Sequence, residues 1–325
     1  MKKVFISGII PRVGIDMLNE EGYTVEEWSN SKPITEKELI SKCQKAEAYL
    51  CIMSQVSENF LKQCSHLKVI ATYSVGFNHI DIATATKLKI PIGNTPDVLS
   101  NATADLAFLL MLNVSRKAFF NYRRILEGKW ESSFSATRYL GQELEGKTLG
   151  IFGMGRIGLK MAEKCRNAYG MKILYHNRNK IINDEKELNA SYVSFEELLL
   201  QSDVLSIHAP LNSENTGIFD KSAFNKMKPS AILINTARGS IVNEIDLITA
   251  LENKQIWGAG LDVTDPEPIQ LDNPLLQMEN VAITPHIGSA TAETRNAMAV
   301  LCAKNIIAGL KGEKLPGIVN PDVYK

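Results

Sequence analysis

Residues 148–165 read TLGIFGMGRIGLKMAEKC, which combines an apolar run, a glycine-rich turn and an amphipathic segment. The run TLGIF predicts a buried strand, and the turn GMGRIG opens a helix directly after it. Gly153 permits the tight turn, Gly155 lets the backbone approach a pyrophosphate, and Gly158 lets helix and strand pack closely. The helix N-terminus then offers unpaired N–H groups to phosphates. The context predicts a dinucleotide-binding unit; the alternative is a plain strand–turn–helix with glycines used only for geometry.

The next strand of this unit ends in LYHNRNK, residues 174–180. About twenty residues after the glycines, such units usually carry an acidic residue that binds the adenosine ribose. This chain has Arg178 and Lys180 instead, and a guanidinium can bind a 2′-phosphate through two hydrogen bonds. Asn177 could donate a further one. The stretch favours NADP(H), with NAD(H) use possible, over a solvated turn with incidental basic residues.

Strands and helices alternate along the whole chain, which is typical of parallel sheets. We expect an α/β fold with two doubly wound parallel-sheet domains, a flavodoxin-like substrate domain and a Rossmann nucleotide-binding domain. The substrate domain spans 1–100 plus 288–325, and the NAD(P)-binding domain spans 101–287. The expected strands are VFISGII, YTVEEW, AYLCIM, KVIATYS, PIGN, TLGIF, MKILYH, DVLSIH, AILINT, GAGLDV and VAIT.

The expected helices have recognisable ends. Thr35 with Glu38, and Ser194 with Glu197, have the spacing of capping boxes, in which each side chain binds the other residue's backbone N–H. One long, largely apolar helix is expected from about Asn101 to Glu127, buried on most faces. A final helix, about 289–310, is expected to return to the first domain because the second is already complete.

Composition excludes several function classes. Lys plus Arg and Asp plus Glu both number 36 in the 325 residues, so no net charge attracts nucleic acid or an anionic membrane. The five cysteines are scattered, which argues against a disulfide framework or a zinc site. The N-terminus lacks the pattern of a signal peptide, and no run reaches the roughly eighteen apolar residues of a membrane span. We expect a cytoplasmic protein with a small-molecule substrate and no metal.

His286 is the strongest acid–base candidate. It lies in TPHIGSAT, after the last strand and at the return crossing between the domains, where ligands bind in such folds. Imidazole titrates near neutral pH, which suits proton transfer; a structural role is the alternative. His208, in SIHAP, could also line the cofactor cleft, although packing is the commoner role for such a residue.

Two further residues follow strands of the same domain. Arg238, in INTARGSIV, could clamp a substrate carboxylate and polarise the adjacent carbonyl. Glu267, in LDVTDPEP, could bind the far nitrogen of His286 and favour the imidazolium. Each residue alone is more often a surface ion-pair partner. Together, at successive strand ends beside a nucleotide loop, they predict an active site.

The chain resembles the D-isomer-specific 2-hydroxyacid dehydrogenases over nearly its whole length. The resemblance is carried by GMGRIG, INTARGSIV, GAGLDVTDPEP and TPHIGSAT, in the family's order and at compatible spacing. Within the family, GNTPDVLSNATADLAFLLML and HIGSATAETRNAM are most similar to the glyoxylate/hydroxypyruvate reductases. The resemblance implies NADPH-dependent reduction of glyoxylate or hydroxypyruvate to glycolate or D-glycerate. It also implies a homodimer formed through the nucleotide domains.

The resemblance also assigns residues. It implies that Arg238, Glu267 and His286 form a catalytic trio, and that the backbone N–H groups of Val75 and Gly76 bind the substrate carboxylate. Ser289 would lie near the substrate. The implied cofactor contacts beyond the glycines are Thr103, Arg156, Ile157, Pro210, Thr236, Asp262 and Gly288.

Other functions fit the same residues. A 2-ketogluconate reductase or a 3-phosphoglycerate dehydrogenase would use the same fold and trio. A non-catalytic, nicotinamide-sensing binding protein is an alternative from another class. In this branch the segment at 129–141 can supply an aromatic side chain to a neighbouring active site, and the candidates here are Trp130, Phe134 and Tyr139.

Overall fold

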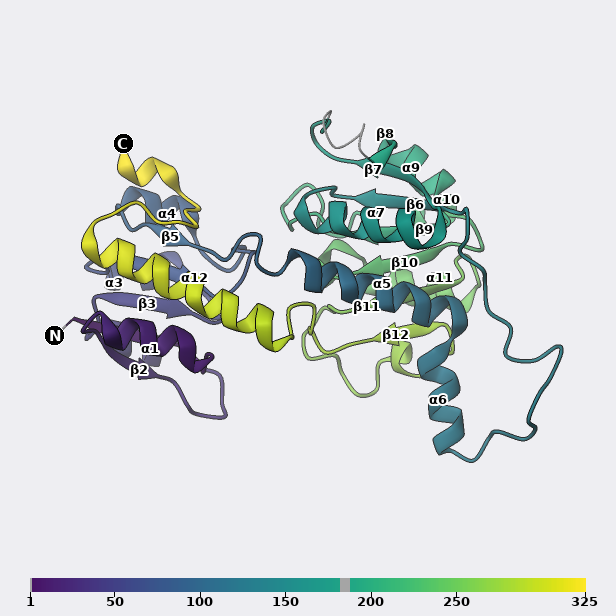
Figure 1. Cartoon of the computed structure of the whole chain (residues 1–325), viewed down its shortest axis with the longest axis horizontal. Coiled ribbons are helices and arrows are strands. Elements are labelled where there is room, and N and C mark those ends of the chain that lie inside the picture. Colours follow the sequence, from purple (N-terminus) through teal and green to yellow (C-terminus); the bar gives the residue numbers. More distant parts are fainter. Residues whose placement is uncertain (1, 182–187) are drawn as a thin grey trace. The chain divides into compact units, whose positions relative to one another are not determined.

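The computed structural model describes residues 2–181 and 188–325, and the chain forms two compact units. The terminal unit comprises Met1–Leu99 with Ser289–Lys325, and the central unit comprises Ser100–Gly288. The sequence-based boundaries differ from these by one residue at each junction. Each unit contains its own parallel sheet flanked by helices, so the expected α/β class with two parallel sheets is confirmed (Figure 1).

The terminal unit has a five-stranded sheet in the order β2-β1-β3-β4-β5. The order reverses beside β1, which is the mark of a doubly wound sheet. Both β3 and β4 are buried along their full length, because helices cover both faces of the sheet. The strands are β1 (Lys3–Ile6), β2 (Thr24–Glu27), β3 (Ala48–Cys51), β4 (Val69–Thr72) and β5 (Ile92–Gly93).

Helices α1 (Arg12–Glu20) and α12 (Ala292–Lys311) lie side by side on one face of this sheet (Figure 1). They approach closely at Gly14, where an added Cβ would lie 2.8 Å from the carbonyl oxygen of Ala299. The other helices are α2 (Glu36–Cys43), α3 (Glu58–Gln63) and α4 (Ile82–Lys87). The capping box of Thr35 and Glu38 opens α2 as the sequence predicts.

The central unit has a seven-stranded sheet in the order β12-β11-β10-β9-β6-β7-β8, with every neighbouring pair parallel. The strands are β6 (Thr148–Phe152), β7 (Lys172–His176), β8 (Ala190–Tyr192), β9 (Val204–Ile207), β10 (Ile232–Asn235), β11 (Gly258–Leu261) and β12 (Val281–Ile283). The sequence did not indicate β8. This three-residue edge strand has no fully buried residue, so it carries no apolar run.

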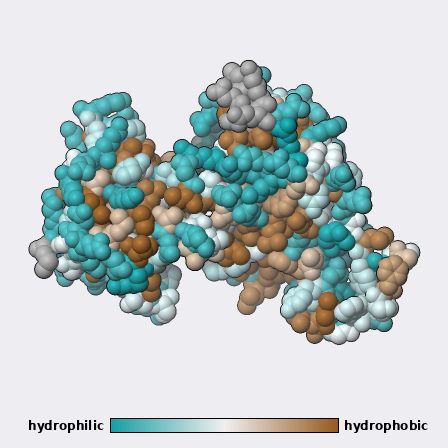
Figure 2. All heavy atoms as spheres, viewed as in Figure 1, coloured by the Kyte–Doolittle hydropathy of each residue, from teal (hydrophilic) through white to brown (hydrophobic). Residues whose placement is uncertain are grey.

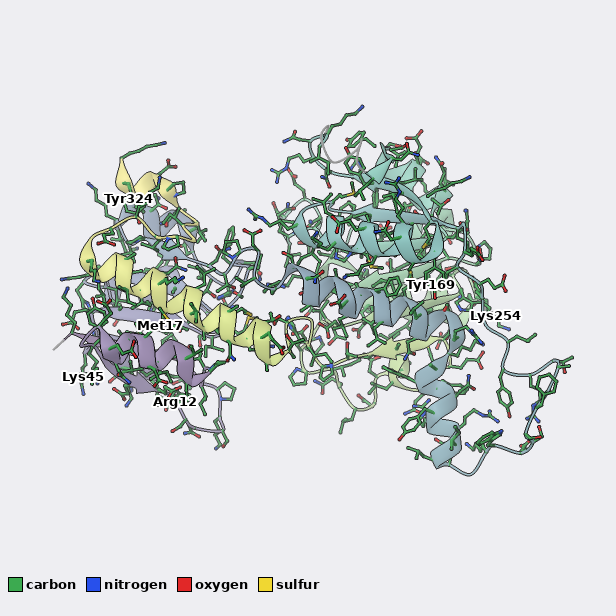
Figure 3. All side chains as sticks on the ribbon, viewed as in Figure 1. Arg12, Met17, Lys45, Tyr169, Lys254 and Tyr324 are labelled. Carbon is green, nitrogen blue, oxygen red and sulfur yellow. The ribbon has the colours of Figure 1, made fainter. Side chains whose placement is uncertain are left out.

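Helices cover both faces of the central sheet. On one face lie α5 (Ser100–Arg116) and α7 (Arg156–Tyr169), which ends at Tyr169 (Figure 3). The rings of Phe108 on α5 and Tyr169 on α7 are 6.0 Å apart. The opposite face is covered by α9 (Phe195–Gln201), α10 (Lys221–Lys226) and α11 (Glu244–Glu252). The capping box of Ser194 and Glu197 opens α9. Among the described helices, none is long and apolar enough to cross a membrane.

The single long helix expected over residues 101–127 is wrong. The chain turns at Lys117, whose φ of +53° lies in the left-handed region, and a separate helix α6 (Ala118–Leu126) follows. Asn113 contributes to the break, because its side-chain oxygen accepts a hydrogen bond from the Phe119 N–H at 3.2 Å and so competes with the helical ladder. Helix α5 is buried as expected, whereas α6 has no buried residue.

Candidate active site at the carboxyl edge of the central sheet

The structure brings Arg238, Glu267 and His286 to the same edge of the central sheet. They follow β10, β11 and β12, which are adjacent and parallel, so their carboxyl ends meet. Nδ1 of His286 and Oε2 of Glu267 are 2.9 Å apart. Arg238 is close enough to Glu267 for their charges to interact. A cation, a carboxylate and an imidazole therefore share one site.

The backbone of His286 is held in an uncommon conformation. Its φ is +53°, and its N–H donates to the carbonyl oxygens of Asp262 and Thr284, each at 3.0 Å. The buried carboxylate of Asp262 fixes the rest of this loop. It accepts hydrogen bonds from the Thr284 hydroxyl at 2.7 Å and from the N–H groups of Ile287 and Gly288 at 2.8 Å. Asp262 thus determines where the imidazole stands.

The charges at the site suit proton transfer. Burial acts to raise the pKa of Glu267, but the hydrogen bond and charge of His286, the Thr264 N–H and Arg238 outweigh it, and the net pKa is lowered. Glu267 is therefore ionised at neutral pH and stabilises a positive charge on the imidazole. Burial lowers the pKa of Arg238, partly offset by Glu267, yet a guanidinium stays cationic at neutral pH.

Arg238 is placed by its neighbours in the loop after β10. The Asn235 side chain donates to its carbonyl oxygen at 2.8 Å, and its own Nη1 donates to the carbonyl oxygen of Ala237 at 2.6 Å. The next residue, Gly239, packs against the loop that leads to Glu267, where an added Cβ would lie 2.1 Å from the Thr264 carbonyl oxygen. Any larger residue would push the two loops apart.

The glycine loop has the geometry expected of a phosphate-binding turn. Gly153 has a φ of +94°, and an added Cβ would lie 2.3 Å from the Ala209 nitrogen. A Cβ on Gly158 would lie 2.9 Å from the carbonyl oxygen of Gly153. At Gly155, by contrast, a Cβ would meet no atom within 4 Å. The protein's own packing does not require glycine there, so that position fits the close approach of a ligand.

Two buried polar atoms near the same edge lack hydrogen-bond partners among the described residues. They are Nδ1 of His208 and the hydroxyl of Thr236, which follow β9 and β10. Such atoms are rare in folded proteins and indicate a ligand or water. Nε2 of His208 is 2.8 Å from the Ser206 hydroxyl, and burial lowers the pKa of His208 to about 3, so this imidazole is neutral. These groups fit a bound nicotinamide cofactor.

The other predicted cofactor residues of the central unit lie around this edge. Thr103 is close to Gly288, where an added Cβ would be 3.2 Å from its methyl group and 3.1 Å from Asp262 Oδ2. Arg156 and Ile157 form the first turn of α7. The carbonyl oxygen of Pro210 accepts a hydrogen bond from the Asn215 side chain at 2.8 Å.

The three candidate residues of the stretch after β7 differ in exposure and in contacts. Asn177 is half-buried, and its side chain binds the backbone of Met154. Arg178 is exposed and forms no ion pair with any residue that the structure describes. The Lys180 ammonium lies 5.1 Å from the centre of the Tyr192 ring. Asn177 therefore contacts the glycine loop, whereas the Arg178 side chain is exposed to solvent.

Val75 and Gly76 belong to the terminal unit and follow β4. Their carbonyl oxygens are bound by the side chains of Asn94, at 2.8 Å, and Ser74, at 2.6 Å. Within residues 2–181 and 188–325, their N–H groups donate no hydrogen bond, as an anion-binding turn requires. Ser289 also belongs to this unit, just before α12. In the described part of the chain, no group of three His, Cys, Asp or Glu residues could hold a metal.

Sequence reasoning missed the residues that hold the site in place. No sequence pattern marks the hydrogen bonds that these residues make. They are the bond of Asn94 to the Val75 carbonyl oxygen, that of Asp262 to the Ile287 N–H, and that of Asn177 to the Met154 N–H. Asn94 lies inside a motif of the family branch, and Asp262 is predicted only as a cofactor contact. Apart from the Thr284 hydroxyl, their partners are backbone groups, which any residue type supplies, so pairings of residue types do not reveal these contacts.

Comparison with known proteins agrees with this geometry. Residues 108–288 match the family "D-isomer specific 2-hydroxyacid dehydrogenase, NAD binding domain". Glyoxylate reductases of Thermococcus litoralis and Pyrococcus furiosus are 44% and 41% identical, covering 99% of this chain and 97% and 96% of theirs. A solved glyoxylate reductase from Paecilomyes thermophila has a TM-score of 0.86 at 33% identity, covering 98% of both chains. An NADPH-dependent glyoxylate/hydroxypyruvate reductase from Sinorhizobium meliloti, solved with NADP and malonate, has a TM-score of 0.87 at 28% identity, covering 99% of this chain and 97% of that one.

The hydrogen bonds that the Asp262 carboxylate accepts can be tested through the stability of the protein. Asp262→Asn preserves the side-chain volume but places an NH₂ group where the structure needs an acceptor. We expect the free energy of unfolding to fall by about 1–3 kcal/mol, because a buried N–H or hydroxyl loses its partner. Urea unfolding followed by circular dichroism measures this. Asp272→Asn, at an exposed position, is the control, and equal urea midpoints for the two variants would contradict the assignment.

Proposed function

Because the chain belongs to the D-isomer specific 2-hydroxyacid dehydrogenase family, we propose that it reduces small 2-oxo acids with NADPH. The proposed substrates are glyoxylate and hydroxypyruvate, which give glycolate and D-glycerate. The observation that carries this proposal is the 2.9 Å pair of His286 and Glu267 beside Arg238. Relatives covering 99% of the chain are glyoxylate reductases, which supports this substrate class over larger 2-oxo acids.

In the proposed mechanism, Arg238 and the N–H groups of Val75 and Gly76 bind the substrate carboxylate. A nicotinamide cofactor, when bound, would supply the hydride that the carbonyl carbon accepts. Nδ1 of His286 is engaged by Glu267, so Nε2 is the nitrogen that gives its proton to the carbonyl oxygen. The ionised Glu267 favours the imidazolium before this transfer and keeps the ring in one orientation.

The proposal assigns the cofactor to the carboxyl edge of the central sheet. The pyrophosphate would lie at the N-terminus of α7, and Arg178, with Lys180, would bind the 2′-phosphate. The remaining contacts would lie along the strand ends, where Thr236 offers its unpartnered hydroxyl. The full proposed set is Thr103, Gly153, Gly155, Arg156, Ile157, Gly158, Asn177, Arg178, Lys180, Pro210, Thr236, Asp262 and Gly288, with Ser289 near the substrate.

The activity itself is tested by following NADPH oxidation at the nicotinamide absorbance band. We expect turnover with glyoxylate and hydroxypyruvate, and a lower kcat/KM with 2-ketogluconate and 3-phosphohydroxypyruvate. Saturable NADPH binding with no turnover on any of these acids would instead favour a nicotinamide-sensing binding protein. A higher kcat/KM with a larger acid would move the proposal to another branch of the family.

The role of His286 predicts a selective loss. His286→Ala removes the proton donor, so kcat should fall by about 10²–10⁴-fold, while the Kd for NADPH stays within about twofold. Stopped-flow turnover and fluorescence titration measure the two quantities. Glu267→Gln keeps a hydrogen-bond acceptor but removes the charge, so a smaller loss of kcat is expected. A kcat near wild type in His286→Ala would show that another group supplies the proton.

The cofactor preference is tested at Arg178. Arg178→Ala removes a charge-assisted contact, so kcat/KM for NADPH should fall roughly 10–100-fold, with little change for NADH. The matched control is Asn179→Ala, an exposed neighbour that should change neither value. Equal losses with both cofactors would mean that Arg178 does not bind the 2′-phosphate.

We further propose that the protein is a homodimer formed through the central unit. Helix α6 leaves Phe119, Tyr122, Ile125 and Leu126 exposed, the last by 70%. The segment 128–141 leaves the end of α6 as an extended loop (Figure 1), in which Trp130, Phe134, Tyr139 and Leu140 are also exposed, and hydrophobic residues alternate there with hydrophilic ones (Figure 2). Eight exposed large apolar side chains within residues 119–140 mark a candidate interaction surface. A second copy would cover it, and one of the three aromatic candidates of this segment would reach the neighbouring active site.

Charge placed on this surface should separate the copies. We expect Ile125→Glu combined with Leu126→Glu to convert a dimer into a monomer, because burying two carboxylates against an apolar partner is costly. Size-exclusion chromatography with light scattering gives the mass. Leu271→Glu changes a residue that is 92% exposed elsewhere on the central unit and should leave the dimer intact. A monomeric wild-type protein would contradict the proposal.

A further inference from the structure

Asn177 stands at the end of β7, where dinucleotide-binding units usually carry the acid that binds the ribose. Its side chain is committed to the glycine loop. Oδ1 accepts a hydrogen bond from the Met154 N–H at 2.6 Å, and Nδ2 donates to the Met154 carbonyl oxygen at 3.2 Å. Met154 is the residue between Gly153 and Gly155, so one side chain satisfies both backbone groups at the centre of the loop.

Contacts outside the glycine loop also hold Asn177 in place. The Tyr192 hydroxyl donates to the Asn177 carbonyl oxygen at 3.1 Å, which ties this residue to the edge strand β8. The preceding residue, His176, accepts a hydrogen bond from the Gly153 N–H at 3.0 Å. Met154 itself is 1% exposed and belongs to the hydrophobic core of the central unit, which also anchors the loop. Three hydrogen bonds therefore join the end of β7 to two consecutive loop residues.

An amide is the side chain of this length that can make both contacts. Aspartate could accept from the Met154 N–H, but its other oxygen would face the Met154 carbonyl oxygen with no proton between them. Alanine would leave both backbone groups without these partners. Arg178, which follows directly, is exposed and has no hydrogen bond to any described residue. Asn177 and Arg178 therefore differ in their contacts: Asn177 binds the glycine loop, whereas Arg178 is exposed to solvent.

We propose that Asn177 is a positioning residue that sets the glycine loop for either nicotinamide dinucleotide, and that discrimination of the 2′-phosphate falls to Arg178. This inference rests on the proposed function in taking the loop to bind such a cofactor. It changes the expected role of Asn177, because the amide acts on the pyrophosphate-binding turn instead of the adenosine ribose phosphate. The consequence is an effect of Asn177 on affinity without an effect on cofactor preference.

The first test uses the protein without any cofactor. Selective labelling with [¹⁵N]methionine gives a spectrum of at most ten signals, in which the Met154 amide can be followed by hydrogen exchange. In Asn177→Ala we expect Met154 to exchange at least about tenfold faster than in wild type, because its acceptor is gone. Met161, buried within α7, is the internal reference and should not change. An unchanged exchange rate at Met154 would overturn the proposed role of the hydrogen bonds between Asn177 and Met154.

The second test compares binding of NADPH and NADH by fluorescence titration. Asn177→Ala should raise the Kd of both by the same factor, roughly tenfold for two lost hydrogen bonds. Arg178→Ala should raise the Kd of NADPH alone, and Asn179→Ala should change neither. A loss confined to NADPH in Asn177→Ala would make Asn177 a phosphate ligand, and unchanged values for both cofactors would also overturn the proposal.

A third variant covers the case in which Asn177→Ala does not fold. Asn177→Asp keeps the acceptor for the Met154 N–H, so Met154 should stay protected, while the unfavourable contact with its carbonyl oxygen should weaken NADH binding. NADH binding at wild-type strength in this variant would contradict the need for an amide. If wild-type protein bound neither dinucleotide, the proposed function would fail, yet the exchange measurement on the unliganded protein would still decide the structural part of the inference.

Discussion

The buried carboxylate of Asp262 is the interaction on which the candidate site depends. It accepts three hydrogen bonds from the loop between β12 and α12, and its backbone carbonyl binds the N–H of His286. Burial dominates and raises the pKa of this carboxyl, so the hydrogen bonds only partly offset the cost of removing the charge from water. The same hydrogen bonds hold the loop of His286 in place. A non-glycine residue in the left-handed region keeps that conformation only when surrounding contacts fix it.

The parts of the fold that follow local chemistry could be predicted from the sequence. The glycine turn, the capping boxes of Thr35 and Ser194, and the apolar runs of the central strands all occur where the sequence indicates them. The break at Lys117 and the edge strand β8 could not be found this way. The first depends on Asn113 competing for a backbone N–H, and the second is too short and too exposed to leave a hydrophobic pattern.

The candidate site shows the same division. Arg238, Glu267 and His286 are recognisable because each follows a strand of one parallel sheet and belongs to a motif. The pairing of His286 with Glu267 is seen in the structure at 2.9 Å. The sequence does not reveal the contacts that support these residues, since Asp262, Asn94 and Asn177 act mainly through backbone groups. Those contacts exist only after folding brings distant loops together.

Gly155 illustrates how such a site is maintained. Around Gly153 and Gly158 the protein itself has no room for a side chain, so folding would penalise any replacement. Around Gly155 there is open space, and an added methyl group would cost the unliganded protein little. An alanine at this position should therefore leave the fold and its stability nearly unchanged. The unliganded fold therefore leaves residue 155 free to carry a side chain, and the space beside it is open to a bound group.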